Sequence, residues 1–239
     1  MIILGIDTTT KICEVTLKIN DNYSIKRVDE GLVHSDKLIF TVEKVFRENN
    51  INSQNIDKIV VNIGPGTFTG IRVGVSFARA FSQICNIKII PIIALDLIKF
   101  IFSYKNKILD YDYIAVLLDA LRNEFYAKIY NIKNKKRNDF VDYKIFNAKE
   151  LVNELEKIDK LEKLLVLKHD KIKNFNIESD DKMKIINFDE NEINNEMNDA
   201  YLIKFAETLD SKSEKNYFEV KPFYIRKTFA EEMKKSRFA

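Results

Sequence analysis

The stretch "ILGIDTTTKICEVTLKI", residues 3–19, contains an apolar run, a polar turn and a segment of alternating polarity. The apolar run stops at Asp7, and three threonines follow it. From Cys13 to Ile19 every second side chain is apolar, which is typical of a strand with one buried face. The stretch therefore predicts a strand, a turn and a second, half-buried strand.

The same pattern returns later as "IAVLLDALRNEFYAKIY", residues 114–130. Here the apolar run ends at Asp119, a tight turn covers residues 120–123, and an alternating segment follows. In both halves a third strand and a helix are expected next. Because internal self-similarity has to be tested before a fold is assigned, we predict an α/β protein made of two related lobes that face each other. The first lobe is expected to have the order βββαβαβ.

We place the first lobe at residues 1–108 and the second at 109–239. A helix near residues 199–209 is assigned to the second round of the pattern, and the C-terminal segment is a candidate to return to the first lobe. The stretch 174–196 is rich in Asn and acidic residues. We interpret it as a surface excursion rather than as a linker between domains.

Composition restricts the class of function. The 39 basic and 36 acidic side chains leave a formal charge of +3, too small to indicate a nucleic-acid binder. The two cysteines, Cys13 and Cys85, have no metal-ligand spacing and predict a reducing compartment. The two histidines, His34 and His169, offer no clustered ligands, so no metal site is expected. The start of the chain lacks a signal-peptide pattern and predicts a cytoplasmic protein without a membrane span.

The glycine-rich stretch "GPGTFTGIRVG", residues 64–74, could hold an anion, because backbone N–H groups at a helix N-terminus favour negative charge. It lacks the Lys-Ser/Thr pair of a Walker A loop and the glycine spacing of a dinucleotide site. The alternative interpretation is structural. In it Pro65 and the glycines shape a tight turn, Thr69 caps the helix, and Phe68 packs over the lobe.

Two predicted helices of the first lobe, residues 35–49 and 70–85, carry more apolar surface than one core requires. On the second, small residues recur every four positions and would let another helix approach closely. On the first, Phe40 projects away from the apolar stripe. Arg72 opposes the helix dipole by about 0.3–1 kcal/mol, so a carboxylate or an anion is expected to compensate it. We therefore predict a protein interface. Its candidate residues are Phe40, Ile71, Arg72, Gly74, Val75, Ala78 and Ser82.

Asp7 and Asp119 stand at equivalent strand ends, where actin-like ATPases hold metal and phosphates. Such enzymes follow the aspartate with glycines, which let the backbone approach phosphate. Here three threonines follow Asp7, and Ala-Leu-Arg follows Asp119. No catalytic residue is therefore assigned. The candidates for nucleotide or anion contact are weak, and they are Asp7, Thr8, Gly66, Thr67 and Asp119.

Five segments in this order resemble the bacterial TsaB (YeaZ) family: "ILGIDTTT", "HSDKL", "NIGPGTFTGIRVGVSFARAF", "LLDALRNEFYAKIY" and "KPFYIRK". The resemblance implies two duplicated actin-like lobes of the ASKHA, RNase H-like class, with mixed central sheets flanked by helices. It also implies a non-catalytic partner of the subunit TsaD, in forming threonylcarbamoyladenosine at position 37 of tRNAs that read ANN codons. Pairing with TsaD is implied through helices 35–49 and 70–85.

The resemblance further implies TsaE as a partner and contact with tRNA through the complex. No intrinsic cofactor is expected, and ATP or ADP would bind at the boundary with TsaD. The surplus apolar surface makes the free chain a candidate homodimer. The rival hypothesis is an autonomous ATPase or small-molecule kinase of the actin-like fold. The two aspartates favour this hypothesis, and the missing glycines count against it.

Overall fold

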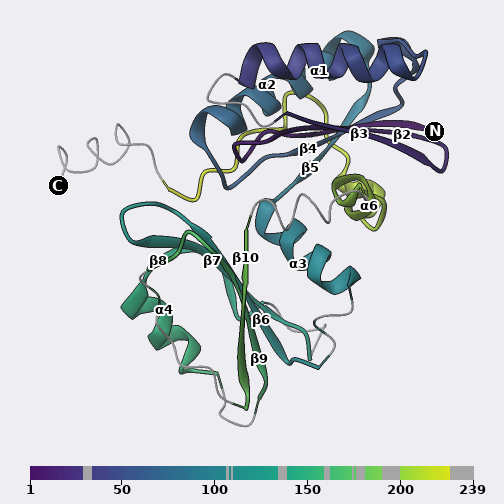
Figure 1. Ribbon diagram of the computed structural model, residues 1–239. Coiled ribbons are helices and arrows are strands. Elements are labelled where there is room, and N and C mark those ends of the chain that lie inside the picture. The colour runs from purple at the N-terminus through teal and green to yellow at the C-terminus, as the bar shows by residue number, and fades with distance from the viewer. Residues whose placement is uncertain are drawn as a thin grey trace. The chain divides into compact units, whose positions relative to one another are not determined.

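The computed structural model describes residues 1–28, 34–105, 108, 110–133, 139–158, 162–173, 175, 181–189 and 200–226, with the backbone alone at 34–36 (Figure 1). The chain divides into two compact units by its internal contacts. The first contains Met1–Lys107 and Phe188–Phe223, and the second contains Ile108–Asn187 and Tyr224–Ala239.

The first unit is built on a mixed five-stranded sheet with the order β3-β2-β1-β4-β5. Its strands are β1 (Ile2–Asp7), β2 (Cys13–Ile19), β3 (Asn22–Val28), β4 (Lys58–Asn62) and β5 (Lys88–Ile92). β1 pairs antiparallel with β2 and parallel with β4, and its last residue, Asp7, lies opposite Glu14. The predicted strand, turn and half-buried strand are therefore confirmed.

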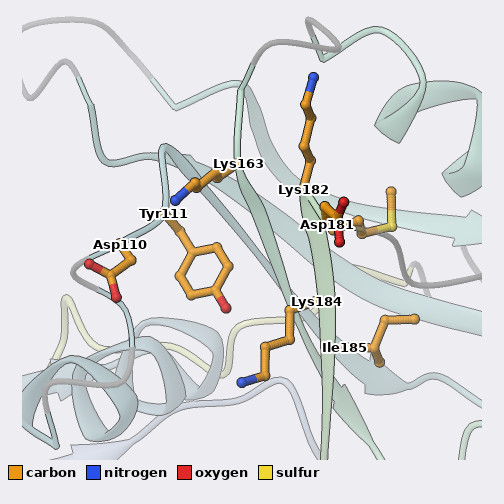
Figure 2. A pocket seen from close by; sticks show the side chains of 8 residues that line it. Asp110, Tyr111, Lys163, Asp181, Lys182, Lys184 and Ile185 are labelled. Atoms are coloured by element: carbon orange, nitrogen blue, oxygen red, sulfur yellow. The ribbon is translucent and has the colours of Figure 1, made fainter.

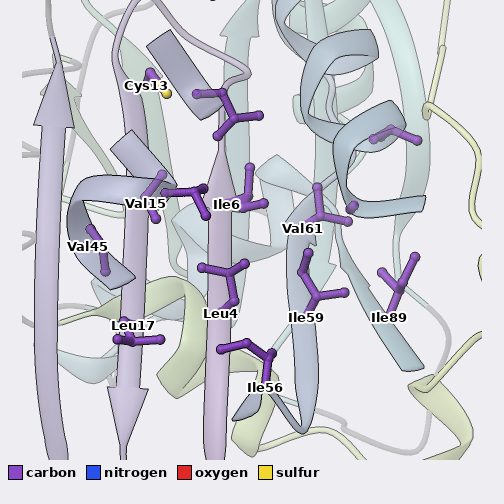
Figure 3. Packing of buried hydrophobic residues seen from close by; sticks show 14 of the residues in the cluster. Leu4, Ile6, Cys13, Val15, Leu17, Val45, Ile56, Ile59, Val61 and Ile89 are labelled. Carbon is purple, nitrogen blue, oxygen red and sulfur yellow. The ribbon is translucent and has the colours of Figure 1, made fainter. Parts of the chain in front are cut away.

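Helices cover both faces of this sheet. They are α1 (His34–Glu48), α2 (Phe68–Cys85), α3 (Ala94–Tyr104) and α6 (Tyr201–Glu207), with short 3₁₀ turns at Ser53–Asn55 and Ser211–Ser213. On the face of α1 and α2, Leu4, Ile6, Ile59 and Val61 belong to one core cluster (Figure 3). Val60 belongs to the cluster that α3 and α6 complete. Because successive side chains of a strand point to opposite faces, a strand buried on both faces is a continuous apolar run.

The helix expected near 199–209 packs in the first unit, not in the second round of the pattern. Leu202 and Ile203 of α6 are fully buried in the same cluster as Ile3 and Val60. A Cβ added to Gly5 would lie 3.1 Å from Cγ1 of Ile203, so the helix lies close to the middle of β1. The physical reason is that the second face of the first sheet needs an apolar cover, which α3 and α6 provide together.

The second unit repeats the strand order of the first, as β10-β9-β6-β7-β8. Its elements are β6 (Tyr113–Asp119), β7 (Glu124–Asn131), β8 (Val141–Asn147), α4 (Ala148–Leu155), β9 (Leu164–His169) and β10 (Met183–Phe188). β6 pairs antiparallel with β7 and parallel with β9, as β1 does with β2 and β4. The predicted duplication is thus confirmed. A capping box between Asn147 and Glu150 begins α4.

Part of the stretch 174–196 forms sheet structure, because it contains β10. The rest of that stretch, apart from residues 175, 181, 182 and 189, lies outside the described residues. Among the helices of the described chain, none is long and apolar enough to span a membrane.

Candidate functional site

The carboxylate of Asp7 fixes the turn that follows β1. Its Oδ1 accepts hydrogen bonds from the backbone N–H of Thr9 at 2.8 Å and from Thr9 Oγ1 at 2.7 Å. Its Oδ2 accepts a bond from Nδ2 of Asn62 at 2.7 Å. Asn62 is a buried side chain that ends β4 and that the sequence analysis missed. The available signal was a polar residue directly after the apolar run "IVV", residues 59–61.

The glycine loop ends at Thr67, which caps α2. The Oγ1 of Thr67 accepts a hydrogen bond from the backbone N–H of Gly70 at 3.2 Å, and the helix begins at Phe68. The prediction that Thr69 is the cap is therefore wrong by two residues. Gly64 has a φ of +108°, a conformation that favours glycine.

The glycines of this loop allow the turn after β1, residues 8–10, to pack against the loop. We call these three residues the threonine turn. Thr67 donates its backbone N–H to the carbonyl of Thr9 at 2.7 Å, and Thr8 donates its hydroxyl to the carbonyl of Gly70 at 2.6 Å. A Cβ added to Gly66 would lie 2.4 Å from the Thr9 carbonyl oxygen, and one on Gly70 would lie 1.9 Å from that of Thr8. The close approach that these glycines permit is to the protein's own backbone.

The five candidates for anion contact therefore divide between the two units. Asp7, Thr8, Gly66 and Thr67 lie together in the first unit, and they are joined through the hydrogen bonds of the threonine turn. Asp119 belongs to the second unit, where its Oδ1 accepts a hydrogen bond from the backbone N–H of Leu121 at 3.0 Å. Each aspartate thus stabilises the turn that follows its own strand.

Most of the predicted interface residues on α2 face their own sheet. Five of them are buried in the first unit: Ile71, Gly74, Val75, Ala78 and Ser82. A Cβ on Gly74 would lie 2.5 Å from Oγ1 of Thr8, which shows why a small residue is needed there. The assignment of these five residues to an exposed interface is corrected by this burial, because α2 uses its small side chains to lie close to β1 and β4.

The solvent-exposed sides of α1 and α2 carry large apolar side chains, unlike the buried side of α2 with its small residues. These large side chains are Ile39 and Phe40 on α1, and Phe68 and Ile84 on α2. We call these four residues the outer helix surface. Phe40 is 69% exposed and Ile84 is 83% exposed, so both present most of their surface to solvent. The helices contact each other beneath this surface through Phe46 and Phe81, whose ring centroids are 6.1 Å apart.

Arg72 is exposed in the first turns of α2 and lies over the ring of Phe68, with 3.9 Å between the guanidinium carbon and the ring centroid. A cation over an aromatic face contributes about 0.5–1 kcal/mol at an exposed site, which is similar to the expected dipole penalty. This contact offsets the unfavourable position of Arg72 at the N-terminal end of α2.

Two buried polar groups near the threonine turn have shifted pKa values. Burial, with Asp7 and Glu14 nearby, raises the pKa of the Cys13 thiol to about 12, so the thiol stays protonated at neutral pH. Burial also raises the pKa of Glu14, although Nε of Arg27 lies 2.7 Å from its Oε2. Within the described ranges no three His, Cys, Asp or Glu side chains form a group that could hold a metal ion.

A cavity of about 490 Å³ lies in the second unit, and none of the residues that line it belongs to the threonine turn. Figure 2 shows the ring of Tyr111 with lysine side chains around it, among them Lys163 and Lys184. Lys182 and Lys184 belong to this lining, and Lys184 lies on β10, an edge strand of the sheet. Lysines on edge strands oppose pairing with another chain, so a structural role accounts for Lys184.

The late segment "KPFYIRK" contacts one turn in each unit. In the first unit, Phe223 donates its backbone N–H to the carbonyl of Ile63 at 2.8 Å, directly before the glycine loop. In the second, Nη2 of Arg226 donates to the carbonyl of Ala120 at 3.0 Å and forms an ion pair with Glu124.

The duplicated mixed sheets and the helix-capped glycine loop define a protein of the duplicated actin-like class. A family model described as "TsaD: tRNA N6-adenosine threonylcarbamoyltransferase" matches residues 32–220. The chain belongs to this family, on its TsaB (YeaZ) branch.

Three relatives illustrate the likeness. The tRNA threonylcarbamoyladenosine biosynthesis protein TsaB of Haemophilus influenzae is 23% identical over 152 residues, 64% of this chain and 62% of the relative. TsaB of Bacillus subtilis is 27% identical over 135 residues, 56% and 57% of the two chains. The alignments thus span less than two thirds of these curated relatives. The solved structure of YeaZ from Pseudomonas aeruginosa covers 93% of this chain and 99% of its own, with a TM-score of 0.67 at 14% identity, and shows the common fold.

Proposed function

We propose that this chain is a non-catalytic partner subunit of a TsaD-type transferase. The reaction is formation of N6-threonylcarbamoyladenosine at position 37 of tRNAs that read ANN codons. The names of the two curated relatives, both TsaB proteins of tRNA threonylcarbamoyladenosine biosynthesis, support the pathway. The observation that carries the non-catalytic role is that the threonine turn is hydrogen-bonded to the glycine loop.

In an actin-like ATPase, the turn after the first strand and the loop at a helix N-terminus would hold phosphate. In this chain the N–H of Thr67 is bonded to the Thr9 carbonyl, and the N–H of Gly70 is bonded to the Thr67 hydroxyl. The Asp7 carboxylate accepts three hydrogen bonds from protein groups. These groups stabilise the fold, and a phosphate would have to displace protein contacts to reach them.

The outer helix surface supports the partner role. Phe40 and Ile84 expose large apolar side chains on two neighbouring helices, while the opposite sides of these helices pack on the sheet. Exposed apolar groups of this kind favour a protein partner, because pairing removes them from water. A TsaD-type subunit is the partner we propose, because the family model that matches this chain is described as a TsaD transferase.

The proposal includes the wider assembly. TsaE joins the complex, tRNA reaches this chain through the complex, and any ATP or ADP binds at the boundary with the TsaD-type subunit. The protein is cytoplasmic, as expected for tRNA modification.

Reconstitution tests the proposed function. The TsaD and TsaE proteins of the same genome are mixed with threonylcarbamoyl-adenylate and tRNA, with and without this chain. We expect modified adenosine only when this chain is present, and none from this chain alone. Full modification in its absence would contradict the proposal. Phosphate release by the pure chain that is lost in Asp7→Asn would also contradict it.

The rival function, an autonomous ATPase or kinase, is tested by melting the isolated chain with ATP and Mg²⁺. A nucleotide at 100 times its Kd would add about 2.7 kcal/mol to the free energy of unfolding. We expect no such shift, because the glycine loop and Asp7 are engaged by the protein itself.

A further inference from the structure

Two signature segments of the sequence meet in the second unit, at the turn between β6 and β7. Residues 120–123 belong to "LLDALRNEFYAKIY", and Arg226 belongs to "KPFYIRK". Nη2 of Arg226 donates to the carbonyl of Ala120 and to the carboxylate of Glu124, across 106 and 102 residues of sequence. We call residues 120–123 the β6–β7 turn. The interface proposed on α1 and α2 uses neither segment.

The backbone of the β6–β7 turn is strained. Three consecutive residues, Leu121, Arg122 and Asn123, have positive φ angles of 62°, 57° and 60°. This left-handed conformation is unfavourable for residues with a Cβ, and residues that adopt it normally occur singly. The Asp119 carboxylate helps to hold the turn, because it accepts a hydrogen bond from the backbone N–H of Leu121 at 3.0 Å. Backbone strain of this kind is concentrated at functional sites, so the turn is a candidate for one.

The turn presents two large side chains to solvent. Leu121 is 71% exposed, and Arg122 is exposed next to it. Within the part of the chain that the structure describes, the guanidinium of Arg122 has no ion pair, hydrogen bond or ring contact. Contacts within the fold therefore account for neither side chain.

The equivalent turn of the first unit is covered. The threonine turn follows β1 as the β6–β7 turn follows β6, and its residues Thr8 and Thr9 are buried. Both are hydrogen-bonded to the glycine loop, at Gly70 and Thr67. The duplicated fold thus encloses one strand-end turn in its own contacts and presents the other to solvent. The exposed turn is available to a partner.

The chemistry of the two side chains favours a protein over RNA. RNA is bound by stacking of bases on aromatic rings and by pairing of phosphates with cations, and a leucine supplies neither interaction. Arginine is enriched at protein interfaces, where it often carries much of the binding energy when apolar neighbours exclude water. We propose that Leu121 and Arg122 form a second protein-binding site, for a partner with an apolar recess beside a carboxylate. The turn is already held in its strained conformation, which lowers the entropy cost of binding.

Identifying this partner as TsaE rests on the proposed function. There the outer helix surface, in the first unit, is assigned to the TsaD-type subunit, and TsaE joins the same assembly. The β6–β7 turn belongs to the second unit. The two proteins therefore bind different residues of this chain and do not compete for them.

The test titrates fluorescently labelled TsaE of the same genome with the preformed complex of this chain and the TsaD-type subunit. Arg122→Gly removes the guanidinium and should weaken TsaE binding about 30-fold or more, the loss expected for a hot-spot arginine. Because glycine adopts positive φ without steric cost, the same variant should raise the melting temperature of the isolated chain. A side chain with a purely structural role would instead lower the melting temperature when it is removed. Leu121→Gly should change both quantities in the same directions as Arg122→Gly.

Two further variants are matched controls. Asn20→Gly replaces another left-handed residue, with a φ of 54°, in the first unit and should leave TsaE affinity unchanged. Arg122→Lys keeps the charge but not the bidentate geometry, so it should retain more affinity than Arg122→Gly.

TsaE affinity equal to that of wild type in Arg122→Gly would overturn the proposal, as would a lower melting temperature of this variant. Weaker binding of the TsaD-type subunit or of labelled tRNA in Arg122→Gly, with TsaE binding unchanged, would assign the turn to that partner and also overturn it. The titration measures binding alone, whereas the reconstitution measures modified adenosine. A complex that binds TsaE through the turn but is not needed for modification would contradict the proposed function only.

Discussion

Gly70 occupies a position where a single methyl group would meet the backbone of another segment. A Cβ there would lie 1.9 Å from the carbonyl oxygen of Thr8, whose own hydroxyl donates to the Gly70 carbonyl. Gly70→Ala should therefore force the threonine turn away from α2 and lower the free energy of unfolding by about 1–3 kcal/mol. Urea denaturation measures this change. Ser76→Ala, at an exposed position of the same helix, is the control and should stay within about 0.5 kcal/mol of wild type.

The buried thiol of Cys13 should give the protein a measurable pH dependence. Its pKa in the folded chain is about 12, above the ordinary value of 9.0, so between these values the thiol ionises in the unfolded chain only. The folded state then binds more protons, and stability is lost as the pH rises above 9.0. Urea denaturation at increasing alkaline pH should show this loss in wild type and in Cys85→Ala, but a smaller loss in Cys13→Ala. An equal loss of stability with pH in Cys13→Ala and Cys85→Ala would contradict the raised pKa of Cys13.

Phe40 offers the sharpest test of the outer helix surface. Because its side chain is 69% exposed, Phe40→Asp should change the free energy of unfolding by no more than about 0.5 kcal/mol. At an interface the same change removes an apolar anchor and buries an unpaired charge, at a cost of about 3 kcal/mol or more. Affinity for the TsaD-type subunit, measured by titration, should fall more than about a hundredfold.

The control for Phe40 is Phe218, which is also exposed but lies outside α1 and α2. Phe218→Asp should bind the TsaD-type subunit like wild type. If both variants bind equally well, Phe40 lies outside the interface. If Phe40→Asp unfolds, the exposed placement of Phe40 is wrong.

At the scale of elements, α6 should stabilise the first unit although it follows the second unit in the chain. Ile203 is fully buried there and contacts the middle of β1 near Gly5. Ile203→Ala should cost about 2–5 kcal/mol, the range for deleting a buried aliphatic side chain. Ile84→Ala, at an exposed position of α2, should cost little. Hydrogen exchange should then show faster opening of β1 and β4 in Ile203→Ala, and unchanged exchange in those strands would contradict the packing.

The strands and their duplication were predictable because they follow from local patterns. The alternation from Cys13 to Ile19 and the repeat ending at Asp119 each lie within one stretch of chain. The position of α6 was not predictable in this way. Its apolar face fits either sheet, and only the packing of distant segments decides which sheet it covers.

The candidate site was predictable only where a local pattern in the sequence determines it. Helical periodicity placed Phe40 away from the core of α1, and the structure agrees. On α2 the apolar residues surround most of the helix, so periodicity could not decide which side faces the sheet. The small residues Gly74 and Ala78 therefore suggested an interface, whereas they fit α2 against its own sheet. The role of Asn62 depends on a contact with Asp7 across 55 residues of sequence, which no local pattern reveals.

At the scale of the whole molecule, the two units use the same device at equivalent places. An aspartate ends the first strand of each, and it accepts a hydrogen bond from the backbone two residues later, at Thr9 in one unit and at Leu121 in the other. The duplicated fold has thus kept the layout of its strand ends. In both units the carboxylate is used to hold a turn.

The outer helix surface leads to an expectation about assembly. A free chain that exposes Ile39, Phe40 and Ile84 should self-associate, because apolar surface without its partner pairs with a related one. Sedimentation at about tens of micromolar should show a dimer for wild type, in equilibrium with monomer by mass action. Phe40→Asp should be monomeric, and Phe218→Asp should behave like wild type.

The TsaD-type subunit should compete with this self-association, because both use the same residues. Adding it in increasing amounts should convert the homodimer into a heterodimer, without a species that contains two copies of this chain joined through α1 and α2. A wild-type chain that stays monomeric would contradict the first part of the expectation. A homodimer that persists in Phe40→Asp, or that binds the TsaD-type subunit without dissociating, would place self-association on another surface and leave α1 and α2 to the partner alone.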